Sequence, residues 1–343
     1  MAPDPAPAPA PPGRDDARPD AWASTAGDGE ALLGRTAVVV VSYGSAELLD
    51  RNLTEVARAV PEALVVVVEN DPEPASTAPT AELCRRQGWV LEQPGTNTGF
   101  GGGMNLGVAR ARARGRDLLV LLNPDAVIAR ADLARLVARA AAEPTALVAP
   151  VLRSSRGTVV ADRAVVCLAD GSMRSPRSSR PAPPGGTRPW LSGACLALST
   201  SLFEAAGGFD ARYFLYWEDV DFSWRVLRAG GRLVPLSQAC AVHDEGGTHN
   251  EAGARAKSLT YYYYNIRNRL LLAALWLEPA EQRRWVASSV GAAREVVLRG
   301  GRRQLLGSFA PVRTAVAATR DGLRLARQVR RGTLPGPDVP LPR

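Results

Sequence analysis

Short, uninterrupted runs of branched apolar residues constrain the fold of this chain more than any other feature. Three of them, Ala37–Val41, Leu64–Val68 and Asp117–Leu122, are separated by segments with helical character. Runs of this length that alternate with helices are typical of strands buried on both faces of a mostly parallel sheet. The sequence therefore predicts an α/β fold, with helices on both sides of a central sheet.

Each of these three runs is followed by polar residues. Ser42 and Tyr43 follow the first run, Glu69 and Asn70 the second, and Asn123–Asp125 the third. In open α/β sheets, ligands bind outside the carboxyl ends of the strands, where the strand order reverses. We therefore expect a binding site at this edge of the sheet.

Composition divides the chain into four parts. Residues 1–33 contain a Pro/Ala repeat and predict a disordered tail. Residues 34–250 carry the α/β pattern, residues 251–330 predict a basic, amphipathic helical extension, and residues 331–343 predict a flexible tail. Within the α/β part, Ser172–Pro189 predicts a long loop, either mobile near a binding site or a variable surface insertion.

Positive charge is concentrated in the last quarter of the chain. Of 343 residues, 42 are Lys or Arg and 34 are Asp or Glu, which gives a net charge of +8. Residues 251–343 hold 17 basic and 6 acidic residues, so their net charge is +11, and that of residues 1–250 is −3. Concentrated arginine attracts polyanions. The favoured partner is an anionic membrane surface or a lipid phosphate, the main alternative is a solvated face, and nucleic acid is not expected.

Several classes of protein are not expected from this sequence. The longest apolar run, Leu270–Leu277, is far shorter than the roughly 18 residues that span a bilayer. The four cysteines lie far apart without a C-x-x-C pair, which argues against a disulfide scaffold or a structural zinc site and favours a reducing compartment. The first residues lack the apolar core of a secretory signal. We expect the protein in the cytoplasm.

Three positions are candidates for chemistry. Asp125 follows a buried strand, where a carboxylate suits Mg²⁺ or Mn²⁺ and phosphate oxygens; a turn or helix-cap role is the alternative. Glu218, Asp219 and Asp221 follow aromatic residues, and an apolar wall makes a carboxylate a better general base; a helix start is the alternative. His243 is either structural or part of a site, and with one other histidine in the chain a multi-histidine zinc site is excluded.

A glycine-rich segment, Pro94–Gly103, predicts a loop that lets backbone approach a ligand, with Asn97 and Asn105 fixing the turn. Its glycines do not have the G-x-G-x-x-G spacing of a dinucleotide-binding loop, and it follows the third predicted strand instead of the first. The chain also lacks a P-loop motif and a G-x-S-x-G nucleophile elbow. P-loop nucleotidases and α/β-hydrolases are therefore excluded.

Taken in order, the motifs resemble those of the family-2 glycosyltransferases, which are inverting enzymes of the GT-A fold. The resemblance runs from about Val38 to Asn268. Within the family the chain is most similar to the rhamnosyltransferase-like branch, because its metal motif reads NPD where many relatives have DxD. The motifs that carry the resemblance are VVVVSYGS, VVVVEN, NTGFGGGMNLG, LLNPD, LSGACLAL, GGFDARYFLYWEDVDFSWRVLRAG, and His243 followed by GGT.

The resemblance implies where the donor would bind. Ser42, Tyr43 and Glu69 would line the pocket for the nucleotide base, although the family usually has Asp at the position of Glu69. Asn97 and the glycine-rich segment would border the nucleotide. Asn123 would also lie at the donor, in the place of the first carboxylate of DxD.

The resemblance also implies the metal site and the catalytic residue. Asp125 would hold a divalent metal ion, Mg²⁺ or Mn²⁺, on the donor diphosphate, and His243 would complete that site. Asp219 would be the base that takes the proton from the acceptor hydroxyl. Two further pairs of residues would lie around the transferred sugar and the acceptor: Gly193 and Ala194 on the donor side, and Trp217 and Glu218 on the acceptor side.

The expected activity is inverting transfer of a sugar, with L-rhamnose favoured, from a dTDP- or UDP-sugar to a saccharide or lipid-linked acceptor in cell-envelope or glycoconjugate synthesis. The enzyme would lie peripherally at the inner face of the cell membrane. Two alternatives come from other classes. A sugar-nucleotide pyrophosphorylase would carry a Gly- and Arg-rich loop after the first strand, where this chain has Ser42–Ser45. A non-catalytic scaffold would use only the basic helices.

Overall fold

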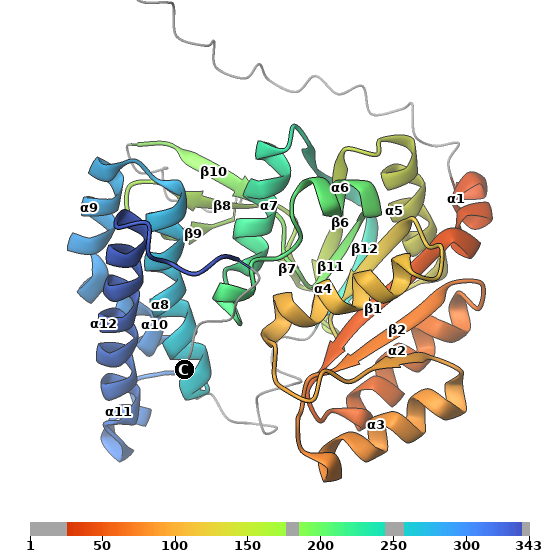
Figure 1. Cartoon of the computed structure of the whole chain (residues 1–343), viewed down its shortest axis with the longest axis horizontal. Coiled ribbons are helices and arrows are strands. Elements are labelled where there is room, and N and C mark those ends of the chain that lie inside the picture. Colours follow the sequence, from red (N-terminus) through yellow and green to blue (C-terminus); the bar gives the residue numbers. More distant parts are fainter. Residues whose placement is uncertain (1–25, 176–184, 244–256, 338–343) are drawn as a thin grey trace, which may run out of the picture.

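The computed structural model describes residues 26–175, 185–243 and 257–337 (Figure 1). The strands are β1 (Thr36–Ser42), β2 (Leu64–Glu69), β3 (Val90–Glu92), β4 (Leu118–Leu122), β5 (Ala126–Ile128), β6 (Ala146–Arg153), β7 (Val159–Ala161), β8 (Ala164–Cys167), β9 (Met173–Arg174), β10 (Thr187–Trp190), β11 (Cys195–Ser199) and β12 (Arg232–His243). The helices are α1 (Ala26–Leu32), α2 (Ala46–Ala59), α3 (Pro74–Gln87), α4 (Gly99–Arg112), α5 (Arg130–Ala142), α6 (Thr200–Ala205), α7 (Glu218–Arg228), α8 (Leu259–Trp276), α9 (Pro279–Ala287), α10 (Ser289–Leu298), α11 (Gln304–Gly307) and α12 (Ala310–Arg330), with 3₁₀ helices η1 (Leu33–Arg35) and η2 (Ala211–Tyr213).

A nine-stranded sheet forms the centre of the molecule, in the order β3-β2-β1-β4-β11-β6-β12-β5, with β7 paired to β6. The long ladders that join β1 to β2, β1 to β4, and β6 to β12 are parallel. Strand β11 is antiparallel to β4 and β6, and β5 is antiparallel to β12. Because β1 lies between β2 and β4, the strand order reverses there, and the carboxyl end of β1 is the expected place for a ligand.

Both faces of this sheet are covered, as the apolar runs predict. Val38 and Val40 of β1 pack in one core with residues of α2, α3 and α5. Val39 points to the other face and packs in a second core with residues of α4, α6 and α7. All seven residues of β1 are buried. Because side chains alternate along a strand, β1 contributes residues to both hydrophobic cores.

Part of the predicted glycine-rich loop is helical, which corrects that prediction. Helix α4 begins at Gly99, whose φ of 74° is a left-handed value that glycine adopts without strain. A Cβ atom on Gly107 would lie 2.3 Å from Cγ1 of Val39, so glycine lets the helix lie close against β1. The glycines of this segment therefore serve helix–sheet packing, and only the part before Gly99 is a loop.

The N-terminal boundary also differs from the prediction. Residues 1–25 of the predicted tail lie outside the described residues, but residues 26–35 form α1 and η1. Leu33 is fully buried in the core that contains Leu133 and Leu136 of α5. The apolar side chain of Leu33 explains why the ordered domain begins before residue 34.

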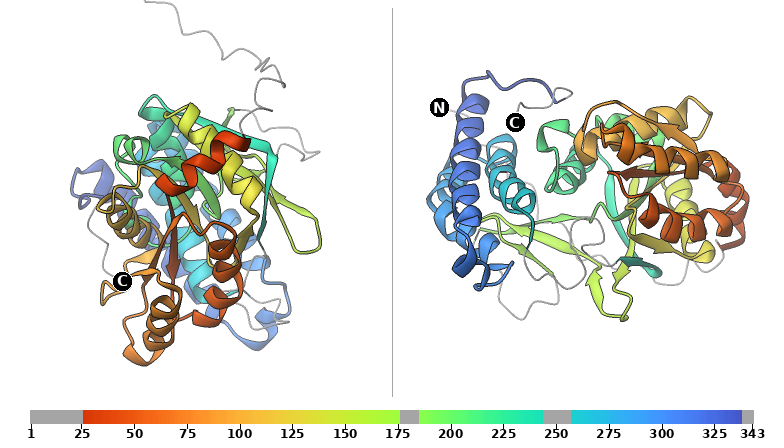
Figure 2. Two further views of the ribbon diagram at one scale, coloured as in Figure 1. Left: turned by 90° about the vertical axis from the view of Figure 1, so that its right-hand side faces the viewer. Right: turned by 90° about the horizontal axis from the view of Figure 1, so that it is seen from below.

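The helices α8–α12 form one end of the molecule and the large sheet forms the other (Figure 1). A small antiparallel sheet in the order β10-β8-β9 includes both flanks of the predicted long loop and lies between these two ends (Figure 2, right). Residues 176–184 of that loop are outside the described residues. Trp285 of α9 donates from Nε1 to the carbonyl of Leu168 at 2.8 Å, which ties the helices to this sheet.

Residues 331–337 pack against the α/β part, in contrast to the flexible tail predicted for 331–343; residues 338–343 lie outside the described residues. The backbone N–H of Ala211 donates to the carbonyl of Pro337 at 3.1 Å, and Arg212 donates to the carbonyl of Pro335 at 2.9 Å. These bonds explain the order of residues 331–337. Among the described helices, none is long and apolar enough to cross a membrane.

Candidate active site

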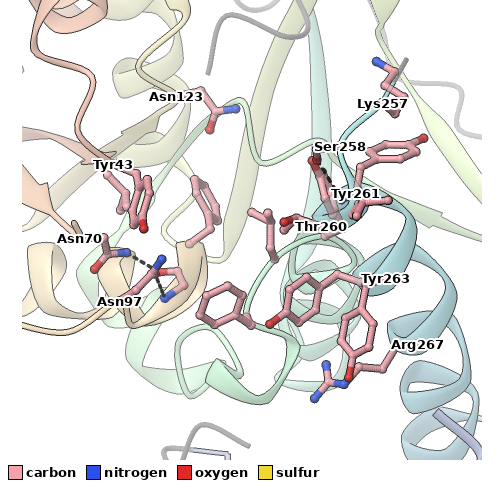
Figure 3. A pocket seen from close by; sticks show the side chains of 18 of the residues that line it. Tyr43, Asn70, Asn97, Asn123, Lys257, Ser258, Thr260, Tyr261, Tyr263 and Arg267 are labelled. Atoms are coloured by element: carbon pink, nitrogen blue, oxygen red, sulfur yellow. Dashed lines mark hydrogen bonds between the residues drawn. The ribbon is translucent and has the colours of Figure 1, made fainter. Parts of the chain in front are cut away.

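A cavity of about 1190 Å³ opens at the carboxyl ends of β1, β2 and β4 and extends to helix α8 (Figure 3). Tyr43, Asn70 and Asn97 lie on one side of it, and Tyr263 and Arg267 of α8 lie on the other. The cavity is therefore at the switch point of the sheet, where the sequence predicts a ligand.

Ser42 and Tyr43 both line this cavity. Ser42 ends β1 and is buried, and its Oγ has no hydrogen-bond partner among the described residues. Tyr43 is 46% exposed. The two residues present a hydroxyl group and a ring to the place where the resemblance puts the nucleotide base.

Glu69 is buried and does not line the cavity, although the sequence predicts it in the base pocket. Its Oε1 accepts from the backbone N–H of Gly44 at 2.9 Å and of Asp71 at 3.1 Å, and its Oε2 accepts from Thr80 at 2.8 Å. The carboxylate is occupied by these three donors and so fixes the loops that follow β1 and β2. Its neighbour Asn70 lines the cavity instead.

Asn70, which the sequence places at the expected ligand edge without a specific role, is a residue of the site. Its Nδ2 donates to the carbonyl of Gly99 at 2.7 Å, and its Oδ1 accepts from the hydroxyl of Thr98 at 2.8 Å. Asn97 lines the cavity as well, and its Oδ1 accepts from the backbone N–H of Gly99 at 2.9 Å. Asn70 and Asn97 together fix the start of α4 against the cavity.

Asn123, Asp125 and His243 lie together in the cavity wall. The Nε2 atom of His243 lies 3.1 Å from Oδ1 of Asp125 and 3.5 Å from Nδ2 of Asn123. The oxygens Oδ1 of Asn123 and Oδ1 of Asp125 are buried and have no hydrogen-bond partner among the described residues. Oδ1 of Asp125 is thus in close contact with the imidazole of His243 without a hydrogen bond.

These three side chains fit a divalent cation. Buried oxygens normally accept hydrogen bonds, so two that accept none, beside an imidazole nitrogen, are candidate ligand atoms. No cluster of three or more His, Cys, Asp or Glu side chains suited to a metal occurs within residues 26–175, 185–243 and 257–337. This is compatible with Mg²⁺, which is usually held by one or two carboxylates and takes its other ligands from substrate phosphates and water.

Asp219, the predicted base, is not among the residues that line the cavity, but it is bonded to a segment that supports the cavity wall. Its Oδ2 accepts from the backbone N–H of Gly193 at 3.1 Å, and the carbonyl of the next residue, Ala194, accepts from the N–H of Asn123 at 2.9 Å. One short segment therefore connects the predicted base to the predicted metal motif. Gly193 and Ala194 are buried and contribute backbone, while Ser192 beside them lines the cavity.

The two adjacent carboxyl groups of α7 have raised pKa values. Burial raises the pKa of Asp219 to about 6, although hydrogen bonds from the backbone of Gly193 and Val220 oppose the shift. Burial, and then the charge of Asp219, raise the pKa of Glu218 well above its usual range. Asp219 is half-buried, whereas Glu218 is buried. A carboxyl group with a pKa of about 6 is mostly ionised at pH ~7.

Trp217 and Glu218, predicted on the acceptor side, do not line the cavity. The indole of Trp217 is buried and packs edge-to-face against Trp285 of α9, with the ring centroids 6.3 Å apart. The ring of Trp217 therefore packs α7 against the C-terminal helices and is not on the cavity wall where an acceptor was predicted. Three residues that precede it, Phe214–Tyr216, line the cavity instead.

The segment that leads into α7 has an unusual backbone. Phe214, Tyr216 and Trp217 have φ values of 67°, 64° and 72°, and they are the only non-glycine residues with positive φ in the described part of the chain. Such conformations cost about 1–3 kcal/mol each and persist only where the surroundings enforce them. Here Asn268 of α8 supplies the support: its Nδ2 lies 2.8 Å from the carbonyl oxygens of Tyr213, Leu215 and Tyr216.

The far wall of the cavity comes from residues that the sequence analysis placed outside the site. The aromatic run Tyr261–Tyr264 begins α8, and three of its four tyrosines line the cavity, as do Lys257, Arg267 and Arg299. Arg299 donates to the hydroxyl of Tyr261 at 3.1 Å. Four consecutive tyrosines followed by arginines were the available signal in the sequence, but only the packing of α8 shows that they face the cavity.

Comparisons with known proteins show which family this chain resembles. A family model described as "Glycosyltransferase like family 2" matches residues 34–264. The N-acetylglucosaminyl-diphospho-decaprenol L-rhamnosyltransferase of Mycobacterium tuberculosis is 29% identical over 230 residues, which cover 60% of this chain and 75% of that protein. The low-salt glycan biosynthesis hexosyltransferase Agl10 of Haloferax volcanii is 25% identical over 248 residues, which cover 71% of this chain and 76% of that protein.

A solved structure shows the same fold. The crystal structure of GalNAc-T7 with UDP, GalNAc and Mn²⁺ is similar with a TM-score of 0.55 and 16% sequence identity. The similar region covers 75% of this chain and 50% of that chain, so the match spans half of the solved protein. The predicted GT-A fold and the predicted class of enzyme are confirmed, with rhamnosyltransferases among the similar proteins. Since the family model matches most of its length, this chain belongs to glycosyltransferase family 2.

Proposed function

We propose that this protein moves a sugar from a nucleotide-diphosphate donor to a hydroxyl group of a saccharide or lipid-linked acceptor, with inversion at the anomeric carbon. One observation carries the proposal. Ser42, Asn123 and Asp125 line one cavity, and each has a buried oxygen that lacks a hydrogen-bond partner among the described residues: Oγ of Ser42, Oδ1 of Asn123 and Oδ1 of Asp125. Because buried polar groups are normally paired, these atoms support a polar ligand in the cavity.

Asp125 would hold a divalent cation, Mg²⁺ or Mn²⁺, with Asn123 and His243 beside it. When bound, the cation stabilises negative charge on the departing diphosphate as a Lewis acid, an effect worth several kcal/mol. The presence of Mn²⁺ and UDP in the structure of GalNAc-T7 supports this part of the proposal. Ser42 and Tyr43 would contact the nucleotide base, and Asn97 would border the nucleotide.

Asp219 would act as the base. It is held by the backbone N–H groups of Gly193 and Val220, which leaves its position fixed beside the wall of the cavity. An ionised carboxylate there can take the proton of the acceptor hydroxyl as that oxygen attacks the anomeric carbon, and general-base catalysis typically contributes about 10²–10⁴-fold. A single in-line displacement inverts the configuration and needs no covalent intermediate.

The relatives support a proposal for the donor and the acceptor. Similarity to an L-rhamnosyltransferase that is named for a diphospho-decaprenol acceptor supports L-rhamnose as the sugar and a lipid-linked acceptor. The proposed carrier is dTDP or UDP, and UDP is present in the structure of GalNAc-T7. The net charge of +11 over residues 251–343 supports peripheral association with the inner face of the cell membrane. A role in synthesis of the cell envelope or of a glycoconjugate follows from such an acceptor.

Thermal unfolding with candidate donors tests the proposal. A ligand that binds only the folded protein raises the melting temperature. We expect dTDP-L-rhamnose or a UDP-sugar to raise it, and the rise should be larger with Mn²⁺ present. Asp125→Asn should lose the additional effect of Mn²⁺. If no dTDP- or UDP-sugar shifts the transition with or without Mn²⁺, the proposed donor class is wrong.

A further inference from the structure

Helices α10 and α12 enclose a second cavity, separate from the active site and open to the surface. It is a groove of about 580 Å³. Most of its lining is aliphatic, including Val290 and Val297 of α10 and Val312, Val316 and Leu323 of α12. Val312 and Val316 are four residues apart and so lie on one face of their helix.

Exposed apolar side chains gather on the same helices and on the segment between them. Val290, Leu306, Phe309, Val312 and Val316 are 80%, 90%, 77%, 43% and 66% exposed. They make up half of the exposed large apolar side chains in the described residues. Single exposed apolar residues are ordinary on protein surfaces, but a contiguous set of them marks an interaction site.

Arginines surround this apolar surface. Arg294, Arg320 and Arg327 line the groove, and all three are exposed. Arg294 and Arg327 make no ion pair with any described residue, and Arg320 lies 3.7 Å from Asp321. Two more exposed arginines, Arg302–Arg303, precede α11. Apolar side chains flanked by exposed arginines are typical of a helix that lies in the interface of an anionic membrane.

The charge also argues against a second copy of this chain as the occupant. A two-fold interface brings the same patch of both copies together, so arginine would face arginine. Like charges brought together in this way cost several kcal/mol, whereas the phosphates of lipid headgroups complement the arginines. The chemistry of the groove therefore favours an anionic lipid over the same surface of another molecule.

We propose that the surface formed by α10, α11 and α12 docks on a bilayer that contains anionic lipids. The arginines contact headgroup phosphates, and the exposed apolar side chains enter the boundary between headgroups and hydrocarbon. The aliphatic groove between α10 and α12 receives a hydrocarbon chain of a lipid. The proposal rests on the proposed function insofar as the acceptor is lipid-linked.

The position of α12 gives this docking a consequence for the active site. Thr314 and Asp321 of this helix line the active-site cavity, whereas Val312 and Val316 line the groove. One helix thus separates the two, and a docked protein holds its active-site cavity beside the headgroup layer. An acceptor anchored in the bilayer would have to extend past only this helix.

Co-sedimentation with vesicles tests the surface. The full chain should bind vesicles of phosphatidylcholine mixed with phosphatidylglycerol, and bind phosphatidylcholine vesicles much more weakly. The double variant Arg294→Gln/Arg327→Gln should weaken binding roughly 25-fold, since each arginine near an anionic surface contributes about fivefold. Val312→Ser/Val316→Ser should weaken binding on the order of tenfold for each side chain. The arginine-dependent part should disappear at high salt.

Matched controls are Arg58→Gln on α2 and Val160→Ser on β7, which change exposed residues outside this surface and should leave vesicle binding unchanged. The donor-induced melting shift should persist in all four variants. Absence of vesicle binding in the unmodified chain, or equal binding by all variants, would overturn the proposal. Concentration-dependent dimers that the groove variants abolish would instead show an interface between copies. Loss of the donor shift in the unmodified chain would contradict the proposed function and not the membrane surface.

Discussion

The side-chain amide of Asn268 donates to the carbonyl oxygen of Tyr216 at 2.8 Å. This bond joins helix α8 to the backbone just before Asp219. Asn268 is fully buried, and its Nδ2 also contacts the carbonyls of Tyr213 and Leu215. A helix outside the central sheet therefore sets the path of the chain toward the proposed base.

Replacing Asn268 with alanine should remove this support. Buried carbonyl groups left without a donor cost about 1–3 kcal/mol, so the free energy of unfolding should fall by roughly 3 kcal/mol. We also expect kcat to fall while donor affinity is kept, because Asp219 loses its fixed position. Chemical denaturation and steady-state kinetics measure the two effects. Asn265→Ala is the control, since Asn265 donates only to Tyr261 within its own helix; an equal loss there would argue against a specific role for Asn268.

Asp219→Asn should lower kcat by about 10²–10⁴-fold and leave donor binding intact. The amide cannot take a proton from the acceptor, but it has nearly the same shape and can still accept from the N–H of Gly193. Single-turnover assays measure the chemical step, and calorimetry with the donor measures affinity. A variant with unchanged kcat would show that another group is the base.

The activity should depend on pH through Asp219. A base must be ionised, and burial raises the pKa of Asp219 to about 6. Therefore kcat/KM should be level above that pH and fall about tenfold per unit below it. An ordinary aspartate would place the fall near pH ~4. A profile of kcat/KM measured on the free enzyme separates the two, and a level rate down to pH ~5 would contradict the raised value.

Asp125→Asn should weaken the dependence of donor binding on a cation. With the carboxylate removed, the apparent affinity for Mn²⁺ should fall by at least the roughly 10–100-fold that loss of an outer-shell partner costs. Titration calorimetry with Mn²⁺ and donor measures this. Asp132→Asn is a suitable control, because Asp132 pairs with Arg135 on α5 and does not line the cavity. Equal effects of the two substitutions would exclude Asp125 as the ligand.

Gly107→Ala should destabilise the protein, since the added methyl group would lie 2.3 Å from Cγ1 of Val39. Overpacking of this kind costs about 1–3 kcal/mol. Gly291→Ala is the matched control: it is also helical, but a Cβ there meets no atom within 4 Å. The unfolding free energy of the Gly291→Ala variant should stay the same or rise by up to about 1 kcal/mol. Similar denaturation curves for both variants would contradict the close packing of α4 on β1.

The sheet and its ligand edge could be predicted because their signals are local. Val38 and Val39 belong to a run with no polar position, which is how a strand buried on both faces differs from a half-exposed one. The position of a residue directly after such a strand is then enough to predict that it lies near the binding site. For this reason Ser42, Asn123 and Asp125 were predicted from the sequence and do line the cavity.

The remaining parts depend on contacts between distant segments. The glycines of the segment Pro94–Gly107, judged from the sequence alone, indicate a loop. Only the short distance from a Cβ placed on Gly107 to Val39 shows that glycine allows close packing of a helix. Trp217 beside three carboxylates suggests an acceptor surface, but its ring turns toward Trp285, sixty-eight positions later in the chain. The role of Asn268 had no local signal, since it consists of bonds to carbonyl groups of another element.

The bonds from Ala211 and Arg212 to Pro337 and Pro335 have a consequence for biosynthesis. The η2 turn just before the proposed base is completed by residues that leave the ribosome more than a hundred positions after it. During translation the central sheet can therefore form early. The η2 turn before Asp219 is completed only after α12 and residues 331–337 have been synthesised. The η2 turn and the proposed membrane-docking surface would therefore both be completed in the same late step of synthesis.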